Sequence, residues 1–177
     1  HCILARDREA GDVLRREDFR KAVIAVVIIC RLKSTRLPMK ALQKIGNLTS
    51  VETCIRGALR FKHINHVILA TSDLDEDAEL GNHLYAPQVL FEKGHPDDLM
   101  ARYLAVIDRH RVDVVVRATA DMPYLSEEIF DCLLASHFAT GADYTRPRKS
   151  AVGTSVSIIN AEAFRRARQY FPNPEYS

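Results

Sequence analysis

The sequence predicts an α/β fold with three layers, in which helices cover both faces of a mostly parallel sheet. Two observations support this prediction. Short apolar runs alternate along the chain with longer segments of helical periodicity, which is the order of βαβ units. The runs at 22–29 and 114–116 are also apolar at every position, as is typical of parallel strands that are covered on both faces.

The strands are predicted where β-branched and other apolar residues gather between polar segments. The first strand leads directly into a basic loop, and the fourth ends a few residues before Asp121. The predicted strands are 22–30, 66–71, 88–91, 113–117 and one near 154–159.

The helices are predicted from apolar residues at helical spacing and from residues that favour helix starts. Ser50 can cap the first helix, and the carboxylates from Asp75 onward suit the positive N-terminal end of the second. Pro96 begins the third helix, and Ser126 can cap the fourth. The predicted helices span 50–61, 75–84, 96–110, 126–138 and 161–170.

Residues 1–21 are expected to form a separate unit. A short strand from Cys2, a turn at Gly11 and a second short strand up to Leu14 are predicted, followed by a brief helical turn at 16–19. A generic hairpin is the alternative interpretation of this segment.

Both ends of the chain indicate a piece of a longer polypeptide. The chain begins with His1 instead of Met, and it reaches Ser177 without a signal that closes a fold. We therefore expect residues 22–177 to form one domain that is truncated at its C-terminal end.

The composition limits the classes of function. A chain of 177 residues can form one domain with a sizeable core, and a net charge of +2 gives no basic footprint for nucleic acid. No apolar run approaches the roughly 20 residues of a membrane helix, and no secretory signal is visible, so we expect a cytoplasmic protein. The cysteines lie far apart, which favours buried, reduced thiols over zinc ligands or disulfides. They are Cys2, Cys30, Cys54 and Cys132.

A basic loop at 31–40 follows the first predicted strand. It contains Ser34 and Pro38 but no glycine, so it is not a Walker A phosphate loop. In open α/β sheets, the loops at the carboxyl ends of strands bind ligands. The loop therefore indicates a phosphate site built from side chains and free amides, with a solvated basic loop as the alternative. Its cations are Arg31, Lys33, Arg36 and Lys40.

A single carboxylate, Asp121, follows the fourth predicted strand. Mg²⁺ favours one or two carboxylates together with water and substrate phosphate, so an aspartate at a strand end suits this ion. Capping or turn formation ahead of the helix at 126–138 is the alternative role.

The pattern Arg31-x-x-Ser-x-Arg-Leu-Pro-x-Lys40 after the first strand resembles the signature of cytidylyltransferases that activate acidic sugars. The resemblance is strongest to the spore-coat polysaccharide biosynthesis protein F type, with the acylneuraminate and Kdo enzymes further off. It covers roughly residues 22–171, and its other blocks follow in the family's order. They are Leu69-Ala-Thr-Ser-Asp73, Asp97-Asp-Leu-x-x-Arg102-Tyr103, Val114-Val-Val-Arg117-x-Thr119-x-Asp121-x-Pro123 and Gly141-Ala-Asp143-Tyr144.

The resemblance implies a Rossmann-like nucleotidyltransferase fold and transfer of CMP from CTP to an acidic, nonulosonic-type sugar, with Mg²⁺ as cofactor and pyrophosphate as product. Surface-glycan biosynthesis would be the setting. Catalytic roles are implied for Arg31, Lys40 and Asp121, of which Asp121 would also bind the metal. Arg146 and Arg148 lie where relatives hold the acidic sugar, with a solvated loop as the alternative. The implied nucleotide-binding residues are Arg31, Ser34, Arg36, Lys40, Thr71, Asp73 and Arg102.

Three positions depart from the family's pattern. Ala120 stands where the family usually has glycine, and Ser155 and Ser157 stand at two acidic positions of a Gly-x-Asp-Val-Glu run. A hydroxyl is a poorer Mg²⁺ ligand than a carboxylate. The enzyme would then use a single carboxylate, use an acid beyond the end of this chain, or have lost activity.

Two alternatives to the cytidylyltransferase hypothesis remain open. A nucleotide-sugar glycosyltransferase would need an Asp-x-Asp metal motif, for which the run from Asp73 to Asp75 comes early in the chain. A nucleotide-binding module without activity would be consistent with Ala120, Ser155 and Ser157.

The N-terminal run Ala5-x-Asp-x-x-x-Gly-x-Val-Leu14 resembles the end of the antifreeze-like domain that closes sialic-acid synthases. This resemblance implies fusion to a sugar-acid synthase. Relatives of the cytidylyltransferase part commonly dimerise, so a homodimer is expected as well.

Overall fold

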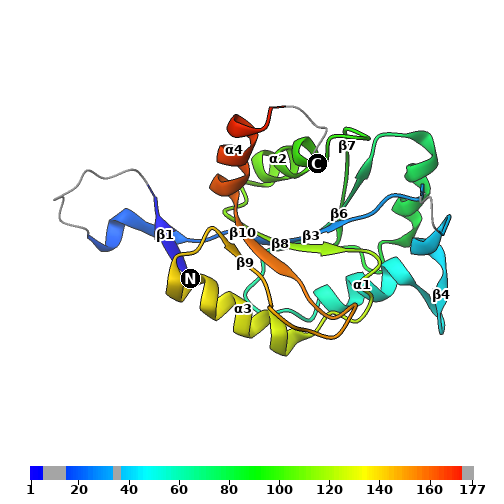
Figure 1. Ribbon diagram of the computed structural model, residues 1–177, viewed down its shortest axis with the longest axis horizontal. Helices are drawn as coiled ribbons and strands as arrows, with labels where there is room; N and C mark the ends of the chain where they lie inside the picture. The colour runs from blue at the N-terminus through cyan, green and yellow to red at the C-terminus, as the bar shows by residue number, and fades with distance from the viewer. Residues whose placement is uncertain (6–14, 34–36, 173–177) are drawn as a thin grey trace.

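The computed structural model describes residues 1–5, 15–33 and 37–172, and it has the three predicted layers. A six-stranded sheet forms the middle layer (Figure 1). Four neighbouring strands are parallel, whereas the two at one edge are antiparallel to their neighbours. In sheet order the strands are β7 (Leu90–Gly94), β6 (His66–Ser72), β3 (Ile24–Ile29), β8 (Val114–Thr119), β10 (Ser157–Asn160) and β9 (Tyr144–Thr145).

Two helices cover each face of the sheet (Figure 1). The helices α1 (Ser50–Ala58) and α3 (Glu127–Thr140) pack on one face, and α2 (Leu99–His110) and α4 (Ala161–Tyr170) pack on the other. The prediction of a mostly parallel sheet between two helical layers is therefore confirmed.

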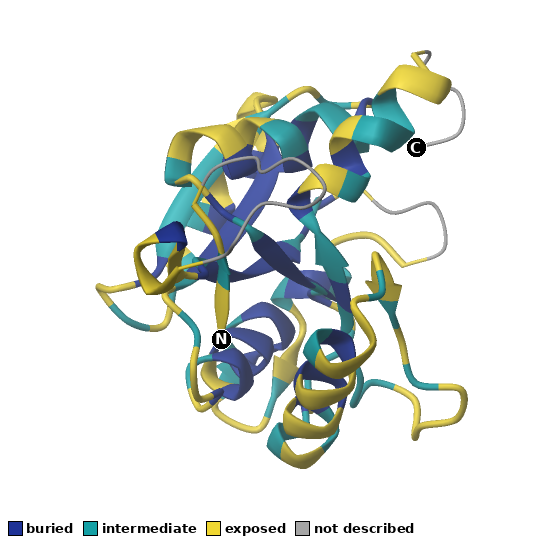
Figure 2. Ribbon diagram, turned by 90° about the vertical axis from the view of Figure 1, so that its left-hand side faces the viewer, coloured by how far each residue is buried: buried dark blue, intermediate teal, exposed yellow. Residues whose placement is uncertain are grey.

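Strand β3 shows why its sequence is apolar at every position. Val26 and Ile28 point into the core under α1 and α3, whereas Ala25 and Val27 point into the core under α2 and α4. All four side chains are fully buried, and the central strands are dark blue in Figure 2. Burial on both faces removes the alternation of a half-exposed strand.

The helix starts follow the sequence with two corrections. Ser126 caps α3 as predicted, accepting a hydrogen bond from a backbone N–H of the first turn. Helix α2 begins at Leu99 instead of Pro96, because Asp98 caps it in the same way. The cap of α1 is Thr49, which forms a capping box with Glu52, and not Ser50 as predicted. Ser50 is the first helical residue, and its hydroxyl donates to the carbonyl of Ala120 at 2.8 Å.

Several short elements differ from the predictions. The segment at 75–84 is a 3₁₀-helix instead of an α-helix, because only Asp77 and Leu80 are buried and no apolar stripe anchors it. Strand β9 and the hairpin β4–β5 were not predicted. The short elements are η1 (Arg16–Asp18), η2 (Lys40–Leu42), η3 (Asp75–His83), β4 (Lys44–Ile45) and β5 (Leu48–Thr49).

The N-terminal residues form a two-stranded sheet of their own, which projects from one side of the molecule (Figure 1). Its strands are β1 (Cys2–Leu4) and β2 (Phe19–Lys21), and η1 confirms the helical turn expected before Phe19. The expected turn at Gly11 and strand up to Leu14 lie outside the described residues. The domain boundary at residue 21 stays a prediction.

None of the helices within the described ranges combines the length and apolar content that crossing a bilayer requires.

The four cysteines are free, but only two of them are buried. Cys30 and Cys54 lie in the core, whereas Cys2 and Cys132 are exposed, so the expectation of four buried thiols is wrong for this second pair. Burial raises the pKa of Cys30 and of Cys54 to about 12. At neutral pH both core thiols are protonated.

We expect a thiol-reactive maleimide to distinguish these two pairs at neutral pH. Cys2 and Cys132 should react within minutes. Cys30 and Cys54 should react at least roughly a hundredfold more slowly, because they are buried and carry little thiolate. Peptide mapping by mass spectrometry measures each rate, and in denaturant all four rates should become similar. Fast labelling of Cys30 in the folded protein would contradict this assignment.

Candidate active site

A pocket of about 400 Å³ opens beyond the carboxyl ends of β3 and β8. These strands are parallel neighbours, and Ile29 pairs with Thr119, so the segments that follow them meet at the same edge of the sheet. The lining residues are Ile29, Cys30, Arg31, Lys33, Lys40, Ala41, Arg117, Thr119, Ala120, Asp121 and Met122.

An ion pair spans this pocket. The Nζ of Lys40 donates to Oδ2 of Asp121 at 2.6 Å, and the hydroxyl of Thr119 donates to Oδ1 at 2.6 Å. Partial burial acts to raise the pKa of Asp121, but the hydrogen bonds from Lys40 and Thr119 outweigh it and hold the pKa below its usual value. The carboxylate is therefore charged at neutral pH. Its alternative role as a helix cap is wrong because Ser126 caps α3. The alternative role in a turn is compatible with the structure, since Asp121 lies in a turn in which the N–H of Met122 donates to the carbonyl of Thr119.

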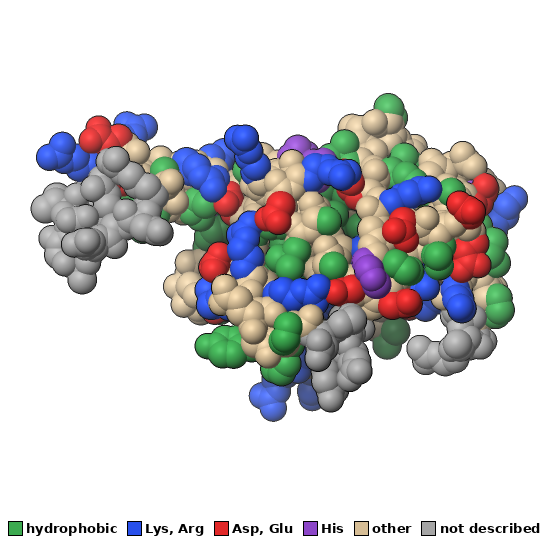
Figure 3. Space-filling view, turned by 90° about the horizontal axis from the view of Figure 1, so that it is seen from above, with side chains coloured by type: hydrophobic (Ala, Val, Ile, Leu, Met, Phe, Trp, Pro, Cys, Tyr) green, Lys and Arg blue, Asp and Glu red, His purple; other side chains and the backbone are tan. Residues whose placement is uncertain are grey.

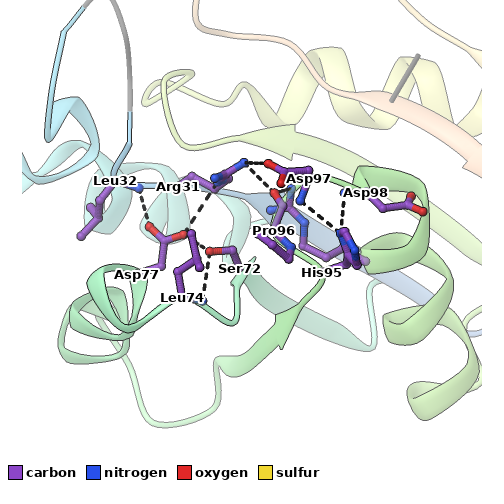
Figure 4. Close-up of polar contacts among 10 residues, drawn as sticks. Arg31, Leu32, Ser72, Leu74, Asp77, His95, Pro96, Asp97 and Asp98 are labelled. Carbon is purple, nitrogen blue, oxygen red and sulfur yellow. Dashed lines mark hydrogen bonds and ion pairs between the residues drawn. The ribbon is translucent and has the colours of Figure 1, made fainter. Parts of the chain in front are cut away.

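Arg31 is held at the edge of the pocket by backbone and acidic groups (Figure 4). Its Nη1 donates to the carbonyl of Pro96 at 2.5 Å and lies 3.4 Å from Oδ1 of Asp97. Its Nε lies 3.9 Å from the carboxylate of Asp77. These contacts fix the guanidinium beside the pocket, where it can meet an anion.

Asp77 organises the start of the basic loop, although sequence reasoning gave it no role in the site. The side chain is fully buried. Its Oδ1 accepts from the backbone N–H of Leu32 at 2.7 Å, and its Oδ2 accepts from the hydroxyl of Ser72 (Figure 4). Its only sequence signal was membership of the acidic run before Leu80, which is common on solvated surfaces.

Arg102 lies behind Arg31 and does not line the pocket. Its side chain is 5% exposed, and Nη2 lies 3.5 Å from the Pro96 carbonyl that Arg31 also contacts. Burial and the nearby Arg31 cation lower the pKa of Arg102. A Cβ on Gly94 would stand 2.7 Å from Cγ of Arg102, so only glycine leaves room for the arginine here.

The other predicted residues that the structure describes lie outside the pocket. Thr71 is fully buried. Asp73 is exposed, and its backbone N–H donates a hydrogen bond to the carbonyl of Gly94. Arg146 and Arg148 are exposed after β9. Ser34 and Arg36 lie outside the described residues. The structure thus brings together Arg31, Lys40 and Asp121 from the predicted set.

The three departures from the family's pattern cluster beside Asp121. Ala120 is buried, and its backbone N–H donates to the carbonyl of Ile29 at 3.2 Å. Ser155 and Ser157 line a small cavity of about 40 Å³ together with Arg117, Ala118, Thr119, Met122 and Val156. Sequence reasoning gave no role to Thr119, although it lies in a quoted block two residues before Asp121.

Figure 3 shows the face of the molecule that carries α2 and α4, which has mixed acidic and basic side chains.

The three-layer fold, with a pocket lined by Arg, Lys and Asp at the carboxyl edge of the sheet, defines an α/β protein of the nucleotidyltransferase type.

The chain belongs to the cytidylyltransferase family, because the family model described as Cytidylyltransferase matches residues 25–175. The chain is 28% identical over 142 residues to the spore coat polysaccharide biosynthesis protein SpsF of Bacillus subtilis (strain 168). This match covers 78% of the present chain and 59% of SpsF. It is 23% identical over 155 residues to 3-deoxy-manno-octulosonate cytidylyltransferase of Rickettsia typhi, covering 84% of this chain and 64% of that enzyme.

The fold is similar to a solved cytidylyltransferase from Leptospira borgpetersenii. The TM-score is 0.77 at 21% sequence identity, and the match covers 87% of this chain and 66% of the other. The present chain thus spans about 60% of the length of the two curated relatives.

Proposed function

We propose that this chain provides the nucleotide site of an enzyme that transfers CMP from CTP to an acidic sugar and releases pyrophosphate, in the biosynthesis of surface glycans. The observation that carries the proposal is the Lys40–Asp121 pair inside a pocket with further cationic walls. The names of the relatives support the substrate class, since one acts in polysaccharide biosynthesis and the other on an octulosonate.

The cationic residues of the pocket suit a triphosphate. Arg31 can form bidentate contacts with phosphate oxygens, and Lys33 and Lys40 offer mobile positive charges. These groups would offset the charge of CTP and of the departing pyrophosphate. In the reaction a sugar hydroxyl oxygen forms a bond to the α-phosphorus and loses its proton to solvent, while the bond from that phosphorus to the pyrophosphate oxygen breaks.

Asp121 fits a Mg²⁺ ion as a single carboxylate ligand, with phosphate and water completing the coordination. Within the described ranges no group of three or more acidic, histidine or cysteine side chains could hold a metal alone, so substrate oxygens would be needed. When bound, Mg²⁺ would supply Lewis-acid polarisation of the α-phosphate. The Nζ of Lys40 donates to Oδ2 of Asp121, so Lys40 would have to move from this oxygen to the phosphates when Asp121 binds a metal ion.

We extend the proposal to the setting of the enzyme. A cytoplasmic location suits it because CTP is available there. The homodimer and the fusion to a sugar-acid synthase rest on the resemblances in the sequence alone. Such a synthase would produce the second substrate on the same polypeptide.

We expect CTP to bind more tightly than ATP, GTP or UTP when Mg²⁺ is present. Calorimetric titration with the four triphosphates tests this, and equal affinities or no binding would overturn the proposal.

Lys40→Met should weaken CTP binding more than CMP binding, because the lost charge faces the distal phosphates. Lys62→Met, which removes an exposed lysine after α1, is the control.

The two alternative functions make different predictions. A glycosyltransferase would use the Asp73 and Asp75 carboxylates, but neither lines the pocket at Asp121. A binding module without activity would bind CTP in the titration and form no CMP-sugar.

A further inference from the structure

We propose that Arg117, together with the hydroxyls of Ser155 and Ser157, binds the carboxylate of the acidic sugar. This inference rests on the proposed function and assigns its second substrate to a place in the pocket. Arg117 lies on β8 and lines both the large pocket at Asp121 and the adjoining cavity of about 40 Å³. A group bound at Arg117 is therefore next to the proposed site of phosphoryl chemistry.

Arg117 is a partly buried cation whose charge is not neutralised by the part of the chain that the structure describes. Most other arginines near the sheet pair with acids, such as Arg109 with Glu92 and Arg168 with Asp98. No described carboxylate lies within 4.0 Å of the Arg117 guanidinium. A partly desolvated guanidinium gains from an anionic ligand.

The neighbour of Arg117 on α2 supplies no compensating charge. Tyr103 is buried, and burial raises its pKa to about 12 against the opposing influence of the Arg117 and Arg102 cations. Its hydroxyl is therefore neutral at physiological pH. The positive charge of Arg117 remains available to a ligand.

Hydroxyl groups surround the same position. Ser157 is the direct cross-strand partner of Arg117 in the antiparallel pair of β8 and β10, so their side chains share a face. Tyr144 of β9 places its hydroxyl 3.3 Å from that of Ser157. Ser155 adds a further hydroxyl to the lining of the small cavity, whereas the Thr119 hydroxyl there already donates to Asp121. Hydroxyls can donate to a carboxylate and to sugar oxygens without competing for the cation.

The size of the cavity matches this use. A cavity needs about 10–15 Å³ to hold one water molecule. The small cavity of about 40 Å³ therefore has room for a group of the size of a carboxylate. The rest of the sugar would extend into the pocket of about 400 Å³, toward Asp121. The serines at the two acidic positions of the family run are then part of substrate recognition, because acids there would neutralise Arg117.

The experiment measures steady-state kinetics with CTP and two acids, 3-deoxy-manno-octulosonate and N-acetylneuraminate, each beside its carboxyl-reduced analogue. For the acid that the unmodified protein uses, Arg117→Met should raise the KM about tenfold to a hundredfold, which is typical of losing a charge-assisted contact. The KM for CTP should change much less, because the triphosphate is assigned to Arg31, Lys33 and Lys40. The preference for the acid over its reduced analogue should disappear. Arg165→Met on α4, an exposed arginine paired with Asp108, is the matched control.

Ser155→Asp separates this inference from a metal role for the same position. A carboxylate beside Arg117 should raise the KM for the acid, whereas a restored metal ligand would raise kcat, and a raised kcat would overturn the inference. An unchanged KM for the acid in Arg117→Met would also overturn it. If the unmodified protein binds CTP but neither acid, the carboxylate site is wrong and the nucleotide site stands. If CTP does not bind, the proposed function itself fails.

Discussion

Asp121→Asn should reduce metal-dependent turnover of CTP by about a hundredfold or more, the scale of losing a main electrostatic group at a reacting phosphate. The amide keeps the size of the side chain but loses the charge that Lys40 and a metal ion would share. Mg²⁺ should then no longer tighten CTP binding. The melting temperature should change little, because the side chain is nearly half exposed and Ser126 caps the following helix.

The measurements are CMP-sugar formation, CTP titration with and without Mg²⁺, and a thermal melt. Asp131→Asn, which changes an exposed carboxylate on α3, is the matched control and should leave all three unchanged. If Mg²⁺ tightened CTP binding to Asp121→Asn as strongly as to the unmodified protein, another group would have to hold the metal.

Asp77→Ala should destabilise the protein by about 3–5 kcal/mol, the usual cost of removing one partner from a buried, hydrogen-bonded charge. The change leaves the N–H of Leu32 and the hydroxyl of Ser72 without their acceptor, and removes the carboxylate nearest to Nε of Arg31. For a domain of this size the melting temperature should fall by about 10 °C. CTP affinity should fall as well, because Leu32 positions the start of the basic loop.

Asp77→Asn is the informative partner of that variant. The amide oxygen can still accept from Leu32, so the stability loss should be smaller, whereas the loss of charge beside Arg31 remains. Asp75→Ala, two residues earlier and exposed, controls for loss of an acid in the same 3₁₀-helix. A melting temperature of Asp77→Ala close to that of Asp75→Ala would contradict the structural role assigned to Asp77.

The layered fold and the position of the pocket could be predicted from local patterns. Strand β3 is apolar at every position because both of its faces are buried, and this continuous apolar run can be recognised in the sequence. Both the basic loop and Asp121 were predicted to follow a strand, and parallel strands end at a common edge of the sheet. The Lys40–Asp121 pair shows that these two segments meet there, 81 positions apart in the sequence.

Other parts of the site depend on contacts that no local pattern encodes. Asp77 resembles its solvated acidic neighbours in sequence, and only its packing against Leu32 and Ser72 distinguishes it. The pairing of Arg117 with Ser157 depends on the antiparallel register of β8 and β10, which is set by the whole sheet. Periodicity thus predicted the main strands and helices, because it acts over a few residues, but it missed short elements such as β9 and the hairpin β4–β5. Which polar groups are buried together was settled by packing between elements far apart in the chain.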